Sequence, residues 1–246
     1  MKGVVWQMNE AIYSYDDVLK MLDSLLREPT EFWDDFYSKR NKGVPFFTES
    51  PDENLVDYFE KAIFNPGKVL ELGCGPGRNA IYFAKNGCEV DAVDLSAESI
   101  KWAGERAKKQ NVKVNFIQQN LFDLHIEDGA YDMVYDSGCF HHIAPHRRMS
   151  YVDVVKSALK PNGLFAVTCF VAGGKLGGAE LSDWEVYRKL SLNGGLGYTD
   201  EKLRQVFSAF DEVEIRKMKV IEQPNHQFGI PDFIVALFRK NKANLN

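Results

Sequence analysis

Two spacings of apolar residues alternate along most of this chain and predict its elements. Short runs rich in β-branched and other apolar residues are bounded by turn-forming residues, which is typical of buried strands. They predict strands at 68–72, 89–94, 113–118, 131–136, 164–170, 212–220 and 233–240. Between them, helical spacing of apolar residues predicts helices at 77–86, 97–109, 146–160 and 200–208. This order of strands and helices indicates the α/β class, a mostly parallel sheet covered on both faces.

The boundaries of these elements carry signals of their own. Ser96 and Thr199 stand where N-cap residues are expected, directly before two of the helices. The segment 160–163, KPNG, is expected to end one helix and turn the chain into the next strand. The segment 222–232 is too short and too rich in breakers for a crossover helix, so the last two strands should form an antiparallel hairpin with a long loop.

The first 67 residues differ from the rest and predict helices that precede the first strand. A helix at 14–28 should begin with a capping box of Ser14 and Asp17 and end at Pro29. Its apolar face carries Val18, Met21, Leu22, Leu25 and Leu26. An aromatic-rich helix at 30–40 and a third at 55–64 follow. We expect one domain over 1–246: a helical extension or lid (1–67), then a core (68–240) with a glycine-rich insertion at 172–198.

Composition and charge narrow the class of protein. The chain has 246 residues, 45% hydrophobic and 26% charged, as in ordinary globular proteins. A net charge of −5 argues against a nucleic-acid partner, and no apolar run is long enough to span a membrane. The four cysteines form no C-x-x-C pair and the N-terminus reads as no secretory signal, so we expect a cytoplasmic protein. A monomer or homodimer is expected.

The stretch VLELGCGPGRNA, residues 69–80, is the strongest candidate for a binding site. It places Gly73, Gly75 and Gly77 between a predicted strand and a predicted helix. Bare backbone there allows positive φ and close approach of a ligand to peptide N–H groups at a helix start. The alternative is a tight turn without a ligand, which needs only one glycine. The dinucleotide pattern G-x-G-x-x-G fails, because Arg78 stands where its third glycine belongs and Pro76 lies inside the loop.

The same stretch resembles motif I of the class I S-adenosylmethionine-dependent methyltransferases, E/D-x-G-x-G-x-G. Glu71, Gly73, Gly75 and Gly77 match its four defining positions, and the resemblance extends from Lys68 to about Lys240. It implies a Rossmann-like three-layer sandwich whose seven-stranded sheet has the order 3-2-1-4-5-7-6, with strand 7 antiparallel. It also implies S-adenosyl-L-methionine as the cofactor and S-adenosyl-L-homocysteine as the product.

Further positions of the resemblance assign parts of the cofactor. Asp94 would bind the ribose hydroxyls; its alternative role, capping the next helix, is already taken by Ser96. Asn120 stands where the family usually has an Asp that holds the adenine amino group, and its amide oxygen can accept the same bond. A simple turn is the alternative there. The residues expected to contact the cofactor are Glu71, Gly73, Cys74, Gly75, Gly77, Asp94, Leu95, Asn120, Leu121, Asp136 and Ser137.

Methyl transfer from a sulfonium is an in-line displacement that requires alignment and exclusion of water, whereas a general base is optional. His141 and His142, after the fourth strand, are the candidate bases, with a purely structural pair as the alternative. The neighbouring Cys139 does not complete a metal site, because C-x-H-H lacks the usual ligand spacing.

The acceptor is expected to bind against the additions to the core. Two aromatic groups could close over an apolar small molecule, with plain helix packing as the alternative for the first. These candidate substrate residues are Trp33, Tyr37, Phe46, Phe47, Trp184 and Tyr187. The layout of the first group loosely resembles the thiopurine and thiol methyltransferase branch.

The sequence therefore predicts a methyltransferase (EC 2.1.1.-) that acts on a small-molecule acceptor through an oxygen, nitrogen or sulfur atom. Two alternatives stay open: a nicotinamide-dependent oxidoreductase on a similar sheet, and a protein that binds S-adenosylmethionine without transferring its methyl group.

Overall fold

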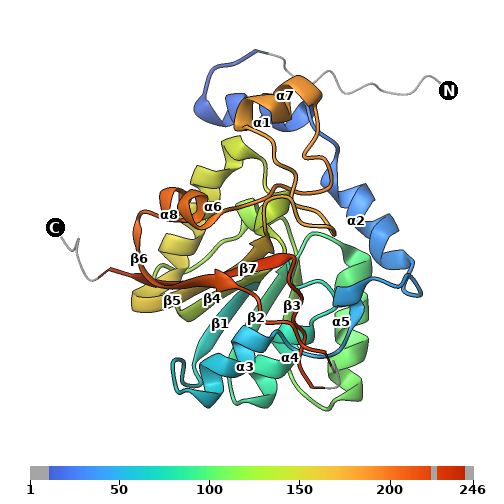
Figure 1. Cartoon of the computed structure of the whole chain (residues 1–246), viewed down its shortest axis with the longest axis vertical. Helices are drawn as coiled ribbons and strands as arrows, with labels where there is room; N and C mark the ends of the chain where they lie inside the picture. The colour runs from blue at the N-terminus through green and yellow to red at the C-terminus, as the bar shows by residue number, and fades with distance from the viewer. Residues whose placement is uncertain (1–10, 223–225, 242–246) are drawn as a thin grey trace.

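Seven strands form one sheet with helices on both faces in the computed structural model, which describes residues 11–222 and 226–241 (Figure 1). The strands are β1 (Lys68–Leu72), β2 (Glu89–Asp94), β3 (Asn115–Gln118), β4 (Tyr131–Ser137), β5 (Leu159–Phe170), β6 (Phe210–Lys217) and β7 (Phe233–Lys240). Their order is β3-β2-β1-β4-β5-β7-β6. β1 to β5 pair in parallel, whereas β7 is antiparallel to both β5 and β6. The predicted fold class, sheet order and antiparallel seventh strand are confirmed.

Eight α-helices surround this sheet in the described part of the chain. They are α1 (Tyr15–Ser24), α2 (Pro29–Ser38), α3 (Glu53–Glu60), α4 (Arg78–Lys85), α5 (Ala97–Lys109), α6 (Arg148–Ala158), α7 (Asp183–Lys189) and α8 (Asp200–Val206). One core cluster packs α6 and α8 against the sheet around Val134 and Phe165. A second cluster packs α3 and α4 against the opposite face around Val69 and Tyr135. Short 3₁₀ turns lie at Pro45–Phe47 (η1), Leu121–Asp123 (η2), Phe140–His142 (η3) and Pro145–Arg147 (η4).

Most element boundaries follow the predicted signals. The capping box of Ser14 and Asp17 starts α1, while Ser96 and Thr199 cap α5 and α8 through their hydroxyl oxygens. The helix expected to end at 160–163 already ends at Ala158, and β5 begins at Leu159. The predicted turn at 160–163 is present inside this strand. Pairing with β4 passes from Tyr131 and Leu159 directly to Met133 and Leu164, and Asn162 between them has φ +65°.

The apolar face predicted for the first helix is not buried against the sheet. Leu19 is the buried residue of α1, whereas Met21 and Leu25 are 42% and 41% exposed. Figure 1 shows α1 above the carboxyl edge of the strands, next to α7 and away from the sheet faces. Its apolar residues border the space above the sheet, which explains why a helix with this pattern contributes little to the core.

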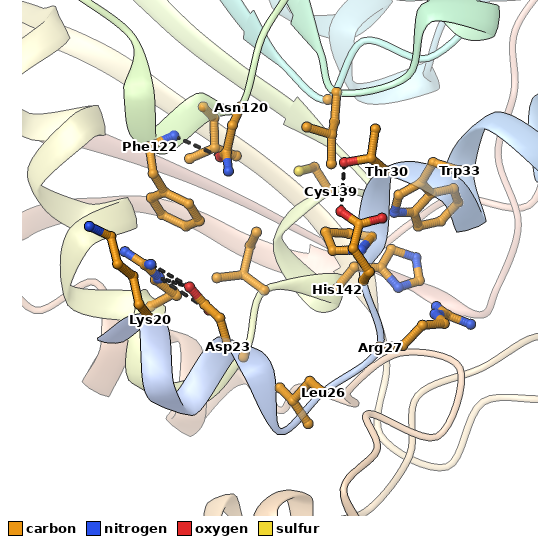
Figure 2. Close-up of a pocket in the computed structure, with 18 of the residues that line it drawn as sticks. Lys20, Asp23, Leu26, Arg27, Thr30, Trp33, Asn120, Phe122, Cys139 and His142 are labelled. Carbon is orange, nitrogen blue, oxygen red and sulfur yellow. Dashed lines mark hydrogen bonds and ion pairs between the residues drawn. The ribbon is translucent and has the colours of Figure 1, made fainter. Parts of the chain in front are cut away.

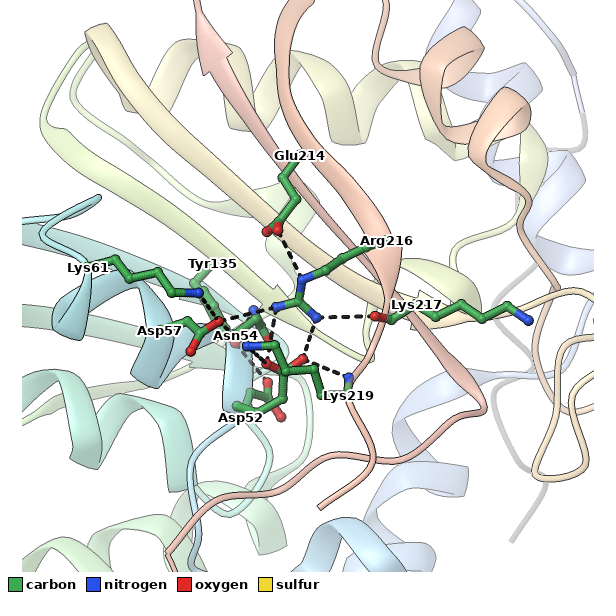
Figure 3. A network of polar contacts seen from close by, with 10 residues as sticks. Asp52, Asn54, Asp57, Lys61, Tyr135, Glu214, Arg216, Lys217 and Lys219 are labelled. Atoms are coloured by element: carbon green, nitrogen blue, oxygen red, sulfur yellow. Dashed lines mark hydrogen bonds and ion pairs between the residues drawn. The ribbon is translucent and has the colours of Figure 1, made fainter. Parts of the chain in front are cut away.

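An ion-pair network ties the N-terminal extension to the far edge of the sheet (Figure 3). Glu53 at the start of α3 is 1% exposed, and its carboxylate accepts bonds from Arg216 Nη1 at 2.5 Å and Nη2 at 3.1 Å. Glu53 also accepts from the backbone N–H of Lys219 at 2.9 Å. Arg216 lies on β6, so this network, which we call the α3–β6 clamp, joins segments about 160 residues apart in sequence.

Candidate active site

A cavity of about 1200 Å³ lies at the carboxyl edge of the sheet, under the N-terminal helices. Its floor comes from the loops after β1, β2, β3 and β4. These floor residues include Gly73, Asp94, Leu95, Asn120, Leu121, Gly138, Cys139 and His142. Its roof comes from α1, α2 and the turn between them, including Met21, Leu26, Arg27, Trp33 and Tyr37. β1 and β4 flank the point where strand order reverses, which is where open α/β sheets bind ligands.

The glycine loop after β1 brings bare backbone to this cavity. Gly73 has φ +66°, and a Cβ added there would overlap Cys139. Gly75 has φ +51°, and an added Cβ would lie 3.0 Å from the hydroxyl of Tyr37. Among the three loop glycines only Gly73 borders the cavity, while Gly77 packs against Ala103 of α5. Packing within the protein thus explains part of the motif, and the three glycines alone do not define a ligand.

Glu71 and Cys74, both predicted on the cofactor, lie beneath the loop and not along the cavity. The Glu71 side chain is 1% exposed, and its Oε2 has no hydrogen-bond partner among the described residues. Burial raises the pKa of Glu71 well above its usual range, and it also raises the pKa of Cys74. Both residues therefore position the loop from below.

Asp94 ends β2 and faces the cavity while holding the glycine loop in place. Its Oδ2 accepts from the backbone N–H of Gly75 at 2.8 Å, and its Oδ1 accepts from that of Ser96 at 2.9 Å. The residue is 8% exposed, and burial raises its pKa. Each carboxylate oxygen has a second lone pair, so Asp94 retains the capacity to accept bonds from ligand hydroxyls.

Asn120 follows β3 and borders the same cavity, opposite Arg27 in the view of Figure 2. Its Oδ1 accepts from the backbone N–H of Phe122 at 3.0 Å. Its amide nitrogen has no hydrogen-bond partner among residues 11–222 and 226–241. The group presented to a ligand is therefore an N–H donor and not the amide oxygen expected from the sequence. A donor at this place complements a ring nitrogen of a purine.

Asp136 and Ser137 support the loop after β4 from inside the protein. Asp136 is 0% exposed, its Oδ1 accepts from Cys139 N at 2.9 Å, and its Oδ2 accepts from the Tyr151 hydroxyl at 2.6 Å. Burial raises the pKa of Asp136 to about 6. Ser137 accepts from Arg78 Nη2 at 3.0 Å. Neither borders the cavity, but Gly138 and Cys139, which they hold, do.

Arg78, the residue that breaks the dinucleotide pattern, has a structural role. Its guanidinium pairs with Asp52 at 2.6 Å, and the two side chains are 8% and 0% exposed. It also donates to the backbone oxygen of Ser50 at 3.2 Å. Arg78 thereby links α4 to the segment before α3 and to the end of β4, a position where a dinucleotide-binding protein needs a glycine for close packing.

The two candidate catalytic histidines have different surroundings. His141 is 2% exposed, its Nδ1 accepts from the backbone N–H of Phe170 at 3.2 Å, and its ring stacks on Phe170 at 3.9 Å. His142 borders the cavity, with its ring 4.8 Å from that of Trp33. Burial, together with the charge of Arg27, lowers the pKa of His142 to about 3. His142 is therefore a neutral imidazole at neutral pH and a weak base.

The predicted substrate residues do not form one group. Trp33 and Tyr37 border the cavity. Phe46 and Phe47 contribute to helix packing, with Phe47 edge-on to Trp102 at 5.0 Å. Trp184 is 74% exposed and lies outside the cavity lining.

Tyr187 belongs to a contact that joins α1, η4 and α7, and that we call the α1 latch. The Tyr187 hydroxyl lies 2.7 Å from His146 Nδ1, and His146 Nε2 lies 2.8 Å from Asp23 Oδ1 on α1. Arg147 Nε donates to the same carboxylate at 3.0 Å. Asp23, Arg27 and Arg147 were not among the site residues expected from the sequence. The signal for Asp23 and Arg27 was the charged residues interspersed on the helix predicted at 14–28, whereas Arg147 had no such signal.

Other features bear on the class of site. All four cysteines are free thiols. In residues 11–222 and 226–241, no group of three or more His, Cys, Asp or Glu side chains is arranged to hold a metal ion. Over the same ranges, no helix has the length and apolar character needed to cross a bilayer. The N-terminal residues read for a secretory signal include 1–10, which lie outside the described part of the chain.

Fold and site together define a class of protein. An α/β sheet with an antiparallel seventh strand differs from the dinucleotide-binding order 3-2-1-4-5-6. Residues 69–163 match the family described as a methyltransferase domain. The chain belongs to the class I S-adenosylmethionine-dependent methyltransferase superfamily.

Two curated relatives are similar to part of this chain. An uncharacterized methyltransferase of Synechocystis is 33% identical over 126 residues, which are 51% of this chain and 54% of that protein. Cyclopropane-fatty-acyl-phospholipid synthase of Escherichia coli is 30% identical over 168 residues, 67% of this chain and 41% of that one. The chain thus spans about half the length of these curated relatives or less.

A solved structure shares the fold at a lower level of identity. It is Burkholderia thailandensis 1,6-didemethyltoxoflavin-N1-methyltransferase with bound 1,6-didemethyltoxoflavin and S-adenosylhomocysteine. The TM-score is 0.62 at 21% identity, and the match covers 94% of this chain and 92% of that one. This similarity extends over the N-terminal helices as well as the sheet, and it concerns the fold alone.

Proposed function

We propose that this protein transfers a methyl group from S-adenosyl-L-methionine to a small-molecule acceptor. The observation that carries the proposal is the single cavity wall on which Gly73, Asp94 and Asn120 meet at the carboxyl ends of β1, β2 and β3. The cavity, at about 1200 Å³, exceeds the roughly 300–1000 Å³ typical of one ligand site. Its size suits a cofactor together with an acceptor.

The residues present fit S-adenosylmethionine. We assign the ribose hydroxyls to Asp94 and an adenine ring nitrogen to the amide nitrogen of Asn120, with Leu121 against the ring. Gly73 supplies backbone that a side chain would block. When bound, the cofactor supplies a methyl group on a positively charged sulfur, already activated for displacement. Glu71, Cys74, Gly75, Gly77, Asp136 and Ser137 hold these loops in position, and Leu95 closes the wall.

The described residues that line the cavity offer no free strong base, which bears on the acceptor atom. Hydrogen bonds lower the pKa of Asp17 and of Glu28, and both oxygens of Asp94 accept from backbone N–H groups. His142 is neutral with a pKa of about 3, and Asp23 is engaged by Arg147 and His146 with a lowered pKa. Burial raises the pKa of the Cys139 thiol and of the Tyr37 hydroxyl well above their usual ranges. We infer that the acceptor brings its own nucleophile, as a thiol with a pKa near 8.5 or below can, whereas an alcohol cannot.

The proposal extends to the protein's location, its partner and its oligomeric state. Free Cys74, Cys88, Cys139 and Cys169 agree with a reducing cytoplasm. The net charge of −5 favours a small-molecule partner over a nucleic acid. The Burkholderia structure binds 1,6-didemethyltoxoflavin, which supports an acceptor of that size here. We propose a monomer or homodimer that acts without a membrane.

The test is turnover with methyl-labelled S-adenosylmethionine against matched thiols, amines and phenols. We expect methylated thiols, with kcat/KM rising with pH until the thiol is ionised. Asp94→Ala should raise the KM for the cofactor about tenfold or more, because two hydroxyl contacts are lost. Asp91→Asn, on the same strand outside the cavity lining, is the control and should leave that KM unchanged. Faster reaction of phenols than of thiols would contradict a base-free site, and cofactor binding without any transfer would leave only a binding protein.

A further inference from the structure

Three cations border the cavity, and Arg27 is the one whose charge is unpaired in the described ranges. Lys20 pairs with Asp16 at 2.5 Å. Arg147 donates two bonds from Nε to the carboxylate of Asp23, at 3.0 and 3.2 Å. Arg27, in the turn between α1 and α2, makes neither a hydrogen bond nor an ion pair with residues 11–222 and 226–241. Carboxylates of α1 therefore pair with Lys20 and Arg147, whereas the charge of Arg27 is available to a ligand in the cavity.

The guanidinium of Arg27 is held in a fixed plane. Its central carbon lies 3.3 Å from the centroid of the Phe32 ring. A guanidinium stacked on an aromatic face keeps its N–H edge free, and that planar edge matches a carboxylate with two parallel hydrogen bonds. The stack therefore preorganises Arg27 for an anion and lowers the entropy lost when one binds.

The side chains around Arg27 complete a subsite with an apolar wall. Figure 2 shows Arg27, Trp33 and His142 together on one side of the cavity, with Leu26 close by and Asn120 on the far side. His142 is neutral, and its two ring nitrogens have no hydrogen-bond partner within the described residues. One of them is an N–H donor in either tautomer. A cation and a second donor thus meet beside aromatic and aliphatic surface.

We propose that Arg27 is a specificity-determining residue that selects acceptors with an apolar or aromatic body and one anionic group, such as a carboxylate. This inference rests on the proposed function. The anionic group lies at the Arg27 edge of the cavity, beside His142, and the apolar body lies along Leu26 and Trp33. Arg27 binds the acceptor and takes no part in bond making.

Carboxylate binding at Arg27 has two possible sources, since the methionine part of the cofactor also carries a carboxylate. We assign the bound carboxylate to the acceptor. Arg27 lies close enough to His142 for its charge to lower the pKa of that residue, and both lie across the cavity from Asn120, which we assign to the adenine ring. The two sources predict different results for cofactor affinity, so the experiment measures it separately.

The experiment is calorimetric titration of the full chain, first with S-adenosylhomocysteine and then, in its saturated complex, with pairs of simple aryl ligands. The pairs are benzoate, phenylacetate and 3-phenylpropionate, each beside its neutral amide. We expect at least one carboxylate to bind the wild type about tenfold or more tightly than its amide. Arg27→Met should abolish this preference and leave the affinity for the amide and for S-adenosylhomocysteine within twofold. Arg27→Lys, which keeps the charge but loses the planar edge, should retain only part of it.

Lys20→Met is the matched control, since Lys20 borders the same cavity but pairs with Asp16. It should leave the preference unchanged. Equal binding of carboxylates and amides by the wild type, or no binding of any pair, would overturn the proposal, as would a preference that survives in Arg27→Met. Loss of S-adenosylhomocysteine affinity in Arg27→Met would assign the residue to the cofactor. No binding of S-adenosylhomocysteine by the wild type would instead contradict the proposed function.

Discussion

At the scale of single residues, side chains of the same type have different positions relative to the cavity. His141 and His142 follow one another in η3, yet His141 lies among Phe170 and the backbone while His142 borders the cavity. In the same way Asp94 at the end of β2 faces the cavity, whereas Asp136 near the end of β4 lies wholly inside. The backbone path, not the residue type, decides which polar group meets a ligand.

Separate replacement of the two histidines should give different defects. His142→Ala should lower kcat/KM by up to about tenfold through lost acceptor contacts, with the free energy of unfolding and the cofactor affinity nearly unchanged. His141→Ala should lower the free energy of unfolding by about 2 kcal/mol, because the backbone N–H of Phe170 loses its acceptor. His125→Ala, in an exposed loop, is the control for both measurements. Equal loss of transfer and stability in both variants would show that the pair acts only structurally.

Asp136 should make stability depend on pH. Its pKa of about 6 lies above the value of about 3.9 expected in the unfolded chain, so the folded state holds the proton more tightly. Its favourable contribution is complete below about pH 4 and is lost as pH rises to about 6. Relative to Asp136→Asn, the wild type should therefore lose about 2 kcal/mol between pH 4 and pH 7. Denaturant unfolding at these pH values measures the difference, and a gap that does not change with pH would be inconsistent with this account.

At the scale of elements, α1 acts as a roof held by the α1 latch. Asp23 is its central residue, bonded to His146 and Arg147 of η4, while Tyr187 joins α7 to the same histidine. Figure 1 shows α1 and α7 side by side above the sheet. Few apolar contacts hold α1, since only Leu19 is buried, so these polar bonds largely determine whether the roof stays closed.

Breaking the latch should loosen α1 without unfolding the sheet. Asp23→Asn removes the carboxylate charge that pairs with Arg147 and changes the group that contacts His146 Nε2, and we expect amide hydrogen exchange across 15–24 to speed up about tenfold. The KM for the acceptor should rise, while the global free energy of unfolding changes by less than about 1 kcal/mol. Asp16→Asn on the same helix breaks only an exposed pair and serves as the control. Unchanged exchange in α1 would show that other contacts hold the roof.

The elements also show how far the sequence determines the fold. Periodicity and caps predicted β1, β2, β7 and α5 at their observed bounds, because their apolar spacing and their local signals agree. α7 was not predicted, since seven residues within a glycine-rich insertion give too short a pattern. Leu159 at the start of β5 was also missed, because its pairing with Tyr131 of β4 comes before the turn at KPNG and leaves no local signal.

Prediction of the site was limited in the same way. Motifs indicated the floor of the cavity, since Gly73, Asp94 and Asn120 lie at or just after strand ends. The motifs did not distinguish residues that border the cavity from residues that support its loops. Glu71 and Asp136 belong to the motifs, but their side chains are buried inside the protein. Roof residues such as Arg27 depend on where α1 docks, a tertiary contact that no local pattern encodes.

At the scale of the whole molecule, buried ion pairs at two adjacent residues, Asp52 and Glu53, join the N-terminal extension to the core. The α3–β6 clamp holds α3 to β6, and Arg78 with Asp52 holds the segment before α3 to α4. We propose that the extension and the core fold as a single domain over 1–246, with 1–67 as the extension and 172–198 as an insertion. Unfolding should then occur in one transition.

Removing the charge of the clamp should destabilise the whole chain. Glu53→Gln leaves Arg216 and Lys219 without their buried partner, and we expect a loss of about 2–3 kcal/mol, since Arg216 is 21% exposed and partly solvated. Glu212→Gln breaks an exposed pair with Arg204 and should cost less than about 1 kcal/mol. Denaturant unfolding followed by fluorescence and by circular dichroism measures both. Two separate transitions, or equal losses in the two variants, would contradict a single cooperative unit.

The most direct test of the whole account is calorimetric titration of the wild-type chain with S-adenosylhomocysteine, and separately with NAD. We predict stoichiometric binding of S-adenosylhomocysteine at micromolar concentration, weakened at least tenfold in Asp94→Ala, and no heat with NAD. Binding of NAD at this cavity with no heat from S-adenosylhomocysteine would contradict the assignment of the cavity to a methyl donor.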